Sequence, residues 1–247
     1  MKKLKDFLIA IAIIAAVGAL ITFLYQSGKD KPRKELARAI SQLSPRGGPP
    51  ETIDGLIQAI RLYEDQHDQN IRDAAQTGVY WKILAMRYAD RGMHNNALEA
   101  LEWAIYYNGD DPFLFNLRGL SASILAKNVS GLSSNINTEK EHFYKIAENA
   151  YLRAMELDIT YTKPMYALGI LYVFELNRPQ DAIVYLERYL QIQSSDVDAM
   201  AVLAMAYYLT ENFSRAIDLY ERIANRTNDR TMKEEALNNI LIIKGML

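Results

Sequence analysis

The side chains that could carry out chemistry are few in this sequence, and their spacing does not suit a reaction. Its 247 residues include three histidines, and no two of them have the spacing of a zinc-binding pair such as H-E-x-x-H. His67 lies in an acidic stretch, residues 64–68, that could be drawn as a metal site but is better explained as a solvated helix surface. The absence of cysteine excludes thiol nucleophiles and cysteine-ligated zinc. We therefore predict no metal site.

Motifs for nucleophilic catalysis or phosphate binding are also missing from the sequence. It lacks G-x-S-x-G, the phosphate-binding loop G-x-x-x-x-G-K-[ST] and the dinucleotide motif G-x-G-x-x-G. Carboxylate pairs such as Glu234-Glu235 lie among other charges, where a hydrated surface is the usual explanation. A formal net charge of −2 argues against a nucleic-acid partner, because phosphate contacts need clustered Lys and Arg. We expect no catalytic residues and no cofactor, so the protein is predicted not to be an enzyme.

An apolar stretch near the amino terminus predicts attachment to a membrane. Residues 7–25 contain no charged side chain, and as a helix they would span roughly 28 Å, close to the thickness of a bilayer's hydrocarbon core. We interpret residues 1–25 as a cytoplasmic tail followed by a transmembrane anchor. The alternative is a cleaved signal peptide with a small-residue cleavage site at residues 16–18.

The charges on either side of this stretch disagree about its orientation. Three lysines precede it and five Lys or Arg residues follow between residues 26 and 38, which by the positive-inside rule favours a cytoplasmic repeat region. A signal-like amino terminus, however, normally remains in the cytoplasm. We expect a single-pass protein of the bacterial inner membrane whose remaining residues lie in the periplasm.

Small residues recur with a fixed period along the rest of the chain. Ala85, Gly119, Gly169 and Ala204 are separated by 34, 50 and 35 residues. A second series, Ala97, Ala147, Ala182 and Ala216, has separations of 50, 35 and 34 residues. Both series indicate a unit of 34 or 35 residues with about 16 extra residues inside the second copy.

The residues around these positions resemble the tetratricopeptide repeat. The first copy contains Trp81, Leu84, Ala85, Tyr88, Ala97, Leu101 and Ala104, which is similar to the family pattern W-x-x-L-G-x-x-Y…A…F…A. The other copies match through Phe115, Gly119, Ala147, Tyr151 and Ala154; Met165, Leu168, Gly169, Tyr172, Ala182 and Leu186; and Met200, Leu203, Ala204, Tyr207, Phe213, Ala216 and Tyr220. The departures are Arg118, Ala122 and Tyr189, where Leu, Tyr and Ala are usual.

The resemblance implies an all-α fold in which helix hairpins stack into a right-handed superhelix, an α-solenoid, behind the transmembrane helix. Helix-start signals agree with it: Asp111 precedes Pro112, Pro179 can open a helix, and Thr138-x-x-Glu141 has the pattern of a capping box.

The domain organisation follows from these patterns. We expect a linker with a short helix at residues 26–50 and an amino-terminal capping helix at 51–77. Four repeats follow at 78–225, with an insertion at about 126–138 that is rich in Ser, Asn and Gly. Residues 226–247 are predicted to form a carboxyl-terminal capping helix.

In this family, partners usually bind the concave face, which is lined by the first helix of each pair. Carried over by helical spacing, the resemblance implies inward-facing positions at Lys82, Met86, Phe113, Asn116, Leu120, Tyr166, Ile170, Val173, Ala201, Met205 and Tyr208. Most of these residues are apolar or aromatic, which favours an amphipathic helix or an extended peptide as partner. The family's clamp of Lys, Asn and Arg for carboxyl-terminal tails is represented here only by Lys82 and Asn116.

The predicted function is that of a membrane-anchored interaction scaffold or assembly factor in a bacterial envelope complex, with secretion, cell-wall and motility machinery as the usual clients. Its partners would be proteins, together with the membrane through residues 7–25. The alternative is a chaperone-like subunit that covers apolar segments of newly translocated proteins. The concave face could instead be filled by the protein's own residues 51–75, by the insertion, or by a second subunit in a homo-oligomer.

Overall fold

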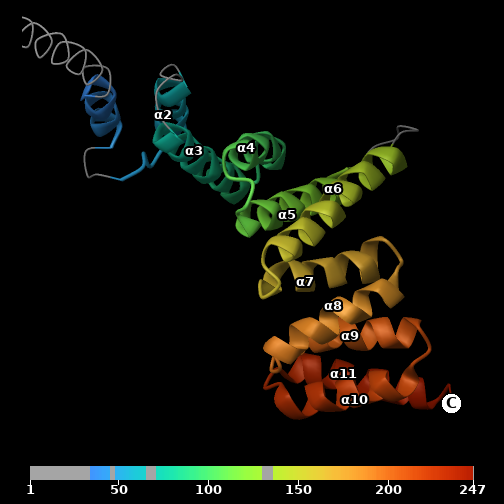
Figure 1. Ribbon diagram of the computed structural model, residues 1–247. Coiled ribbons are helices and arrows are strands. Elements are labelled where there is room, and N and C mark those ends of the chain that lie inside the picture. Colours follow the sequence, from blue (N-terminus) through green and yellow to red (C-terminus); the bar gives the residue numbers. More distant parts are fainter. Residues whose placement is uncertain (1–33, 45–47, 65–70, 130–135, 247) are drawn as a thin grey trace, which may run out of the picture. The chain divides into compact units, whose positions relative to one another are not determined.

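The computed structural model describes residues 34–44, 48–64, 71–129 and 136–246 (Figure 1). Every regular element in these ranges is a helix, which confirms the all-α prediction for this part of the chain. None of the helices found there is long and apolar enough to cross a bilayer. The predicted anchor, residues 7–25, lies outside the described ranges.

The chain divides into two compact units, Met1–Tyr80 and Trp81–Leu247. The first unit contains a helical stretch at residues 34–43, helix α2 (Ile53–Glu64) and the first half of α3 (Ile71–Asp90). Helix α3 runs without a break through the boundary between the units. The predicted division between a capping helix (51–77) and the first repeat (78 onwards) therefore falls within this one helix. The sequence has no proline at that division to end the helix.

A small core joins α2 to the first half of α3. Helix α2 begins after Thr52, whose hydroxyl oxygen accepts a hydrogen bond from the backbone amide of Gly55 at 3.0 Å. Leu56 on α2 is fully buried. Near the end of the helix, the ring of Tyr63 contacts that of Tyr80 on α3, with centroids 5.3 Å apart.

The second unit is a row of helix pairs (Figure 1). The pairs are the end of α3 with α4 (His94–Tyr107), α5 (Pro112–Asn128) with α6 (Ile136–Leu157), α7 (Thr162–Ile170) and the π-helical η1 (Leu171–Glu175) with α8 (Pro179–Ile192), and α9 (Val197–Leu209) with α10 (Phe213–Arg226). Helix α11 (Arg230–Lys244) packs on α10. From α4 onwards each helix packs on the next, which is the stacked arrangement that the repeat predicts.

Two of the three predicted helix starts are observed. Asp111 caps α5 by accepting a hydrogen bond from a backbone amide, and Pro112 occupies the first turn of that helix. Pro179 likewise occupies the first turn of α8, where the preceding residue, Arg178, makes no side-chain cap. The third prediction was wrong, because α6 begins at Ile136 and Thr138 therefore lies inside the first turn rather than before it.

Three of the turns between paired helices share one backbone geometry. In each, a residue with positive φ follows the first helix, and the next amide donates to a tyrosine carbonyl five or six residues earlier. The three sets are Gly92 with Met93 and Tyr88, Asn177 with Arg178 and Tyr172, and Glu211 with Asn212 and Tyr207. Gly and Asn adopt this conformation readily, whereas Glu211 adopts it at a cost in free energy.

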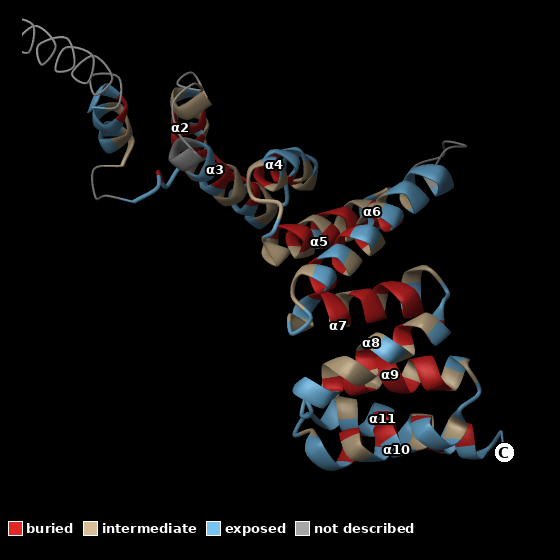
Figure 2. Cartoon of the chain, viewed as in Figure 1, coloured by how far each residue is buried: buried red, intermediate tan, exposed pale blue. Residues whose placement is uncertain are grey.

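The small residues of the repeat lie where paired helices come closest. A Cβ atom at Gly119 would be 2.5 Å from the ring of Tyr151 on α6, and one at Gly169 would be 2.5 Å from the side chain of Leu186 on α8. The two alanines of the same series are fully buried. Figure 2 shows that buried residues run along α5, α7 and α9, so the core of the second unit lies between stacked helices.

Candidate functional site

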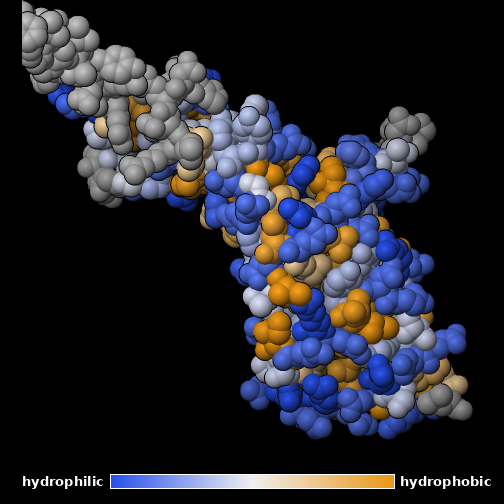
Figure 3. Space-filling model, viewed as in Figure 1, coloured by the Kyte–Doolittle hydropathy of each residue, from blue (hydrophilic) through white to orange (hydrophobic). Residues whose placement is uncertain are grey.

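The predicted concave-face residues lie on the first helices of the pairs, and all but one keep part of their surface exposed. Leu120 is 46% exposed and Met86 is 37% exposed. We use the name inner-face residues for the set Lys82, Met86, Phe113, Asn116, Leu120, Tyr166, Ile170, Ala201, Met205 and Tyr208. On the side of the second unit seen in Figure 3, apolar side chains reach the surface in patches among charged ones.

Val173 differs from the prediction, because it is only 5% exposed and packs in the core. The helix changes to a π turn at this point, and the amide of Leu176 donates to the carbonyl of Leu171 at 3.0 Å. A π turn holds one more residue than an α turn and so rotates the following side chains away from the 3.6-residue period. Phe174, 55% exposed, is the solvent-facing side chain here, and helical spacing alone could not identify it.

Lys82 is engaged by neighbouring groups of its own chain. Its Nζ atom lies 2.6 Å from Oδ2 of Asp111 and 4.7 Å from the centroid of the Phe113 ring. The two charged side chains are only about one-third exposed, so water screens their attraction in part. An incoming carboxylate would have to compete with Asp111 for Lys82, which makes a carboxyl-terminal clamp at this position unfavourable.

A pocket of about 180 Å³ lies between α5 and α7, and two inner-face residues, Leu120 and Ile170, belong to its wall. We call it the α5–α7 pocket. Its lining is mostly apolar and consists of Leu120, Ser123, Ile124, Lys127, Tyr151, Ala167, Ile170, Leu171 and Glu175. The volume is below the roughly 300–1,000 Å³ of pockets that hold substrates or cofactors.

An ion pair forms the polar edge of the α5–α7 pocket. The Nζ atom of Lys127 lies 3.2 Å from Oε1 of Glu175, and the hydroxyl of Tyr144 donates to the other carboxylate oxygen. Burial alone would raise the pKa of Glu175, but the Tyr144 hydroxyl and the Lys127 ammonium, with Lys140 nearby, hold it below its ordinary value. The Lys127 side chain is 53% exposed and that of Glu175 only 17%, so this edge presents its ammonium group to solvent.

Tyr166, an inner-face residue of α7 that does not line the α5–α7 pocket, packs against a second tyrosine. Its ring stacks on that of Tyr189 from α8, with centroids 5.3 Å apart and an interplanar angle of 29°. The Tyr189 hydroxyl donates to Asp196 at 2.6 Å. Burial, with the neighbouring carboxylate, raises the pKa of Tyr189 to about 12. Since Asp196 also caps α9, one carboxylate connects α8 to the start of the next pair.

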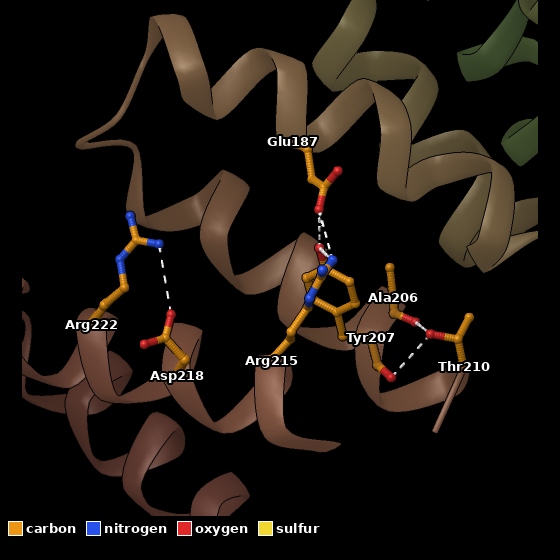
Figure 4. A network of polar contacts seen from close by, with 7 residues as sticks. All are labelled: Glu187, Ala206, Tyr207, Thr210, Arg215, Asp218 and Arg222. Carbon is orange, nitrogen blue, oxygen red and sulfur yellow. Dashed lines mark hydrogen bonds and ion pairs between the residues drawn. The ribbon is translucent and has the colours of Figure 1, made fainter. Parts of the chain in front are cut away.

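At two successive junctions, a tyrosine at the end of the first helix contacts the preceding pair. Tyr207 donates its hydroxyl to Glu187 of α8, and its ring centroid lies 5.3 Å from the guanidinium of Arg215 (Figure 4). Arg215 also donates to both partners, at 3.2 Å to Glu187 and 3.0 Å to the Tyr207 hydroxyl. The corresponding residues one junction earlier are Tyr172, Glu148 and Arg178. These contacts stabilise the stacking of pairs, and the sequence analysis did not identify them.

A second, larger cleft of about 470 Å³ lies beside Tyr207, between α8, α9 and α10. Leucines form its floor, and its edge carries the four charged side chains Glu187, Arg215, Asp218 and Arg222. Arg222 and Asp218 are 3.9 Å apart on α10 (Figure 4). The four charges sum to zero, so the cleft favours ligands of neither sign, and no inner-face residue lines it.

The histidines do not form part of a site in the described ranges. Within those ranges, no three His, Asp or Glu side chains come together as a possible metal site. His94 lies with its Nδ1 atom 3.5 Å from the Ser121 hydroxyl, and burial lowers its pKa. His67 lies outside the described residues, so its surroundings stay a prediction.

Comparisons with known proteins support the tetratricopeptide repeat family. The family model described as tetratricopeptide repeat matches residues 173–233, which run from η1 to the start of α11. A protein of Borreliella burgdorferi, named TPR repeat-containing protein, is 19% identical over 216 residues. That match covers 86% of this chain and 90% of the relative.

Two solved structures share the fold. The structure titled "Crystal structure of YrrB: a TPR protein with an unusual peptide-binding site" has a TM-score of 0.60 at 15% identity, and the match covers 79% of this chain and 84% of YrrB. A thermophilic TPR protein from Thermus thermophilus has a TM-score of 0.51 at 15% identity, with coverage of 84% and 98%. At these identities the likeness concerns the fold alone, a solenoid of helix pairs.

Proposed function

We propose that this chain is a non-catalytic interaction scaffold that binds protein partners through its inner-face residues. The observation that carries the proposal is that apolar and aromatic side chains on the first helices of successive pairs stay partly exposed, with Met86 and Leu120 the most exposed among them. An apolar surface that remains open on a folded chain is typical of an interaction site. The fold shared with YrrB, whose title names a peptide-binding site, supports the same interpretation.

The chemistry of the inner face favours a segment of polypeptide with an apolar side. Met86 and Met205 have flexible side chains that adapt to different partner shapes. Asn116 is the remaining polar inner-face residue besides Lys82, which already contacts Asp111. An amphipathic helix or an extended peptide therefore fits this face better than a charged carboxyl-terminal tail.

We further propose that residues 7–25 anchor the chain in a bacterial inner membrane, with the repeats in the periplasm and the partner in a secretion, cell-wall or motility complex. The support is the uncharged apolar stretch and the signal-like lysines before it. An alkaline carbonate wash of isolated membranes tests the anchor, which should stay in the pellet. Protease added to spheroplasts tests the orientation, because periplasmic repeats should be digested without lysis.

A charge placed on the inner face tests the binding proposal. Full-length wild-type protein, Ile170→Glu and Val184→Glu are compared by cross-linking in cells, detergent extraction, affinity purification and quantitative mass spectrometry. Val184 is the matched control because it is 59% exposed on α8, the second helix of the same pair. We expect Ile170→Glu to lose the captured partner and Val184→Glu to keep it, with helicity by circular dichroism unchanged in both.

The identity of the captured material separates the proposed function from its alternative. One partner in a fixed ratio supports a scaffold, whereas many unrelated unfolded clients support a chaperone-like subunit. If wild-type protein and Ile170→Glu captured the partner equally well, the binding surface would have to lie outside the inner face.

A further inference from the structure

We propose that the α5–α7 pocket receives one large apolar side chain from an internal segment of the partner, and that an acidic side chain next to it in the partner contacts Lys127. This inference rests on the proposed function and specifies the chemistry of the segment that binds. It follows from three observations: the volume of the pocket, the partners that its polar groups already have, and the inner-face residues that lie on either side of it.

The size of the pocket limits its occupant to a single side chain. Its volume of about 180 Å³ is too small for a substrate or cofactor, which usually need roughly 300 Å³ or more. Leu120, Ile124 and Ile170 provide branched apolar walls, and these three side chains remain partly exposed. A buried side chain that fills such a pocket is the usual source of most binding energy at a protein interface.

The tyrosine in the pocket wall needs no hydrogen bond from the side chain that fills the pocket. The Tyr151 ring lies there, is 2% exposed, and has its hydroxyl 3.4 Å from the Ser123 hydroxyl. Burial raises the pKa of Tyr151 to about 12, although the Ser123 hydrogen bond acts in the opposite direction. The phenol is therefore neutral and has a partner within its own chain, so an apolar side chain can cover it without leaving a polar atom unsatisfied.

Charge at the edge selects the neighbouring residue of the partner. Glu175 is the one carboxylate among the lining residues, and both of its oxygens are already used, by Lys127 and Tyr144. An ammonium group has three donors, of which Glu175 takes one. Lys127 is the more exposed member of the pair, so the partner meets a cation with donors to spare and not an anion. A carboxylate on the partner is complementary to this edge.

The inner face continues on both sides of the pocket, which is why we assign the carboxylate to an internal acidic side chain. Phe113 and Asn116 precede Leu120 on α5, and Met205 and Tyr208 follow on α9. A chain that lies along these residues enters and leaves the pocket region instead of ending in it. Lys82, the residue most suited to a terminal carboxylate, is the less available of the two lysines: it lies 2.6 Å from Asp111 and is 31% exposed, against 3.2 Å from Glu175 and 53% for Lys127.

Blocked synthetic peptides test the inference directly on the full-length protein in detergent. The parent peptide is Ac-Ser-Ala-Leu-Glu-Ala-Ser-NH2, and two analogues carry alanine in place of leucine or glutamine in place of glutamate. Binding is followed by the NMR shifts of the Ile124 and Ile170 methyl groups. The alanine analogue should bind about tenfold more weakly or worse, because it buries three fewer carbons. The glutamine analogue should bind about three- to fivefold more weakly, as expected for one exposed ion pair.

Variants of the protein assign the charge effect to one residue. Lys127→Gln should bind the glutamate and glutamine peptides equally, and Lys127→Arg should restore the preference for glutamate. Lys163→Gln, an exposed lysine of α7 that does not line the pocket, should behave like wild type. Because the comparison is between two peptides on one folded variant, a small loss of stability does not affect it.

Three results would overturn the inference. They are unshifted Ile124 and Ile170 methyl groups at the highest parent-peptide concentration, equal binding of the alanine analogue, and tighter binding of a peptide that ends in leucine with a free carboxylate. None of them bears on the proposed function, which is tested separately by the partner that wild-type protein and Ile170→Glu capture in cells. The two proposals can therefore fail separately.

Discussion

Gly119 on α5 lies so close to Tyr151 on α6 that a Cβ atom at this position would come 2.5 Å from a carbon of the tyrosine ring. Tyr151 is 2% exposed and packs in the core, so a shift of its ring would disturb the packing around it. The close approach brings α5 onto α6 and leaves the Tyr151 ring as part of the α5–α7 pocket. One small residue thus connects the packing of the repeat with the shape of the inner face.

Gly119→Ala should therefore destabilise the protein. An added methyl group in this core is expected to lower the free energy of unfolding by about 1–3 kcal/mol, even though alanine is the better helix former. Urea denaturation followed by circular dichroism measures the change. The control is Gly245→Ala, where the nearest atoms to a new Cβ would be at 3.4 and 3.5 Å. Wild-type stability for Gly119→Ala would show that the two helices are less closely packed than described.

Glu211→Gly should stabilise the protein. Glu211 has a φ of 60° in the turn after α9, a conformation that costs a residue with a Cβ atom more than it costs glycine. We expect a gain of about 0.5–1 kcal/mol in the free energy of unfolding, measured by the same denaturation experiment. Asn177→Gly, at φ 50°, is the comparison and should change stability less, since asparagine tolerates this conformation. A loss of stability in Glu211→Gly would contradict the strain assigned to this turn.

The ionised carboxylate of Glu175 should stabilise the folded protein, and this stabilisation should be lost in acid. Its pKa in the folded protein lies below the ordinary 4.5, so the unfolded chain binds more protons and the contribution is present above pH 4.5. As the pH falls through the folded pKa, the carboxylate is protonated and the contribution disappears. Glu175→Gln should be less stable than wild type at neutral pH and should lose less stability between neutral and acidic pH.

The exposed Glu156, which pairs with Arg153 at 2.9 Å, supplies the control for this titration. Glu156→Gln should follow the wild-type stability curve closely, because a solvent-exposed ion pair contributes little. Parallel pH curves for wild type and Glu175→Gln would show that Tyr144 and Lys127 do not stabilise the ionised carboxylate.

Helix α11 should contribute to the core through only one of its faces, the face that carries Ile243. Ile243 is 1% exposed and Leu241 is 70% exposed on the same helix. Ile243→Ala is expected to cost about 2–4 kcal/mol of unfolding free energy, whereas Leu241→Ala should change it by less than about 0.5 kcal/mol. Thermal unfolding of the two variants measures the contrast. Similar melting temperatures would indicate that α11 does not cap the repeats.

The repeat could be predicted from the sequence because its determinants are local and periodic. Gly119 and Gly169 recur at helix crossings where only a small residue fits, and Pro112 and Pro179 open helices by their fixed φ. Helical spacing, applied to the resemblance, likewise predicted which side chains of the first helices stay partly exposed, with Val173 as the exception. These features could be predicted from residue type and spacing alone, without knowledge of which residues are in contact in the folded chain.

Other features depend on contacts that the sequence does not reveal. The π turn of η1 buries Val173 and exposes Phe174, although nothing in the local spacing distinguishes the two. The contacts that Tyr207 and Arg215 make with Glu187 join residues of different pairs. The α5–α7 pocket likewise requires α5, α6, α7 and η1 to meet, so its lining could be found only from the structure.

Site-specific photo-cross-linking in cells tests the central claim, that partners bind the inner face, most directly. The photoreactive amino acid p-benzoylphenylalanine is placed either at Leu120, 46% exposed on α5, or at Val184, 59% exposed on α8. We predict a discrete cross-linked product from position 120 that is absent from position 184. Products from position 184 alone, or an identical set from both positions, would contradict the claim.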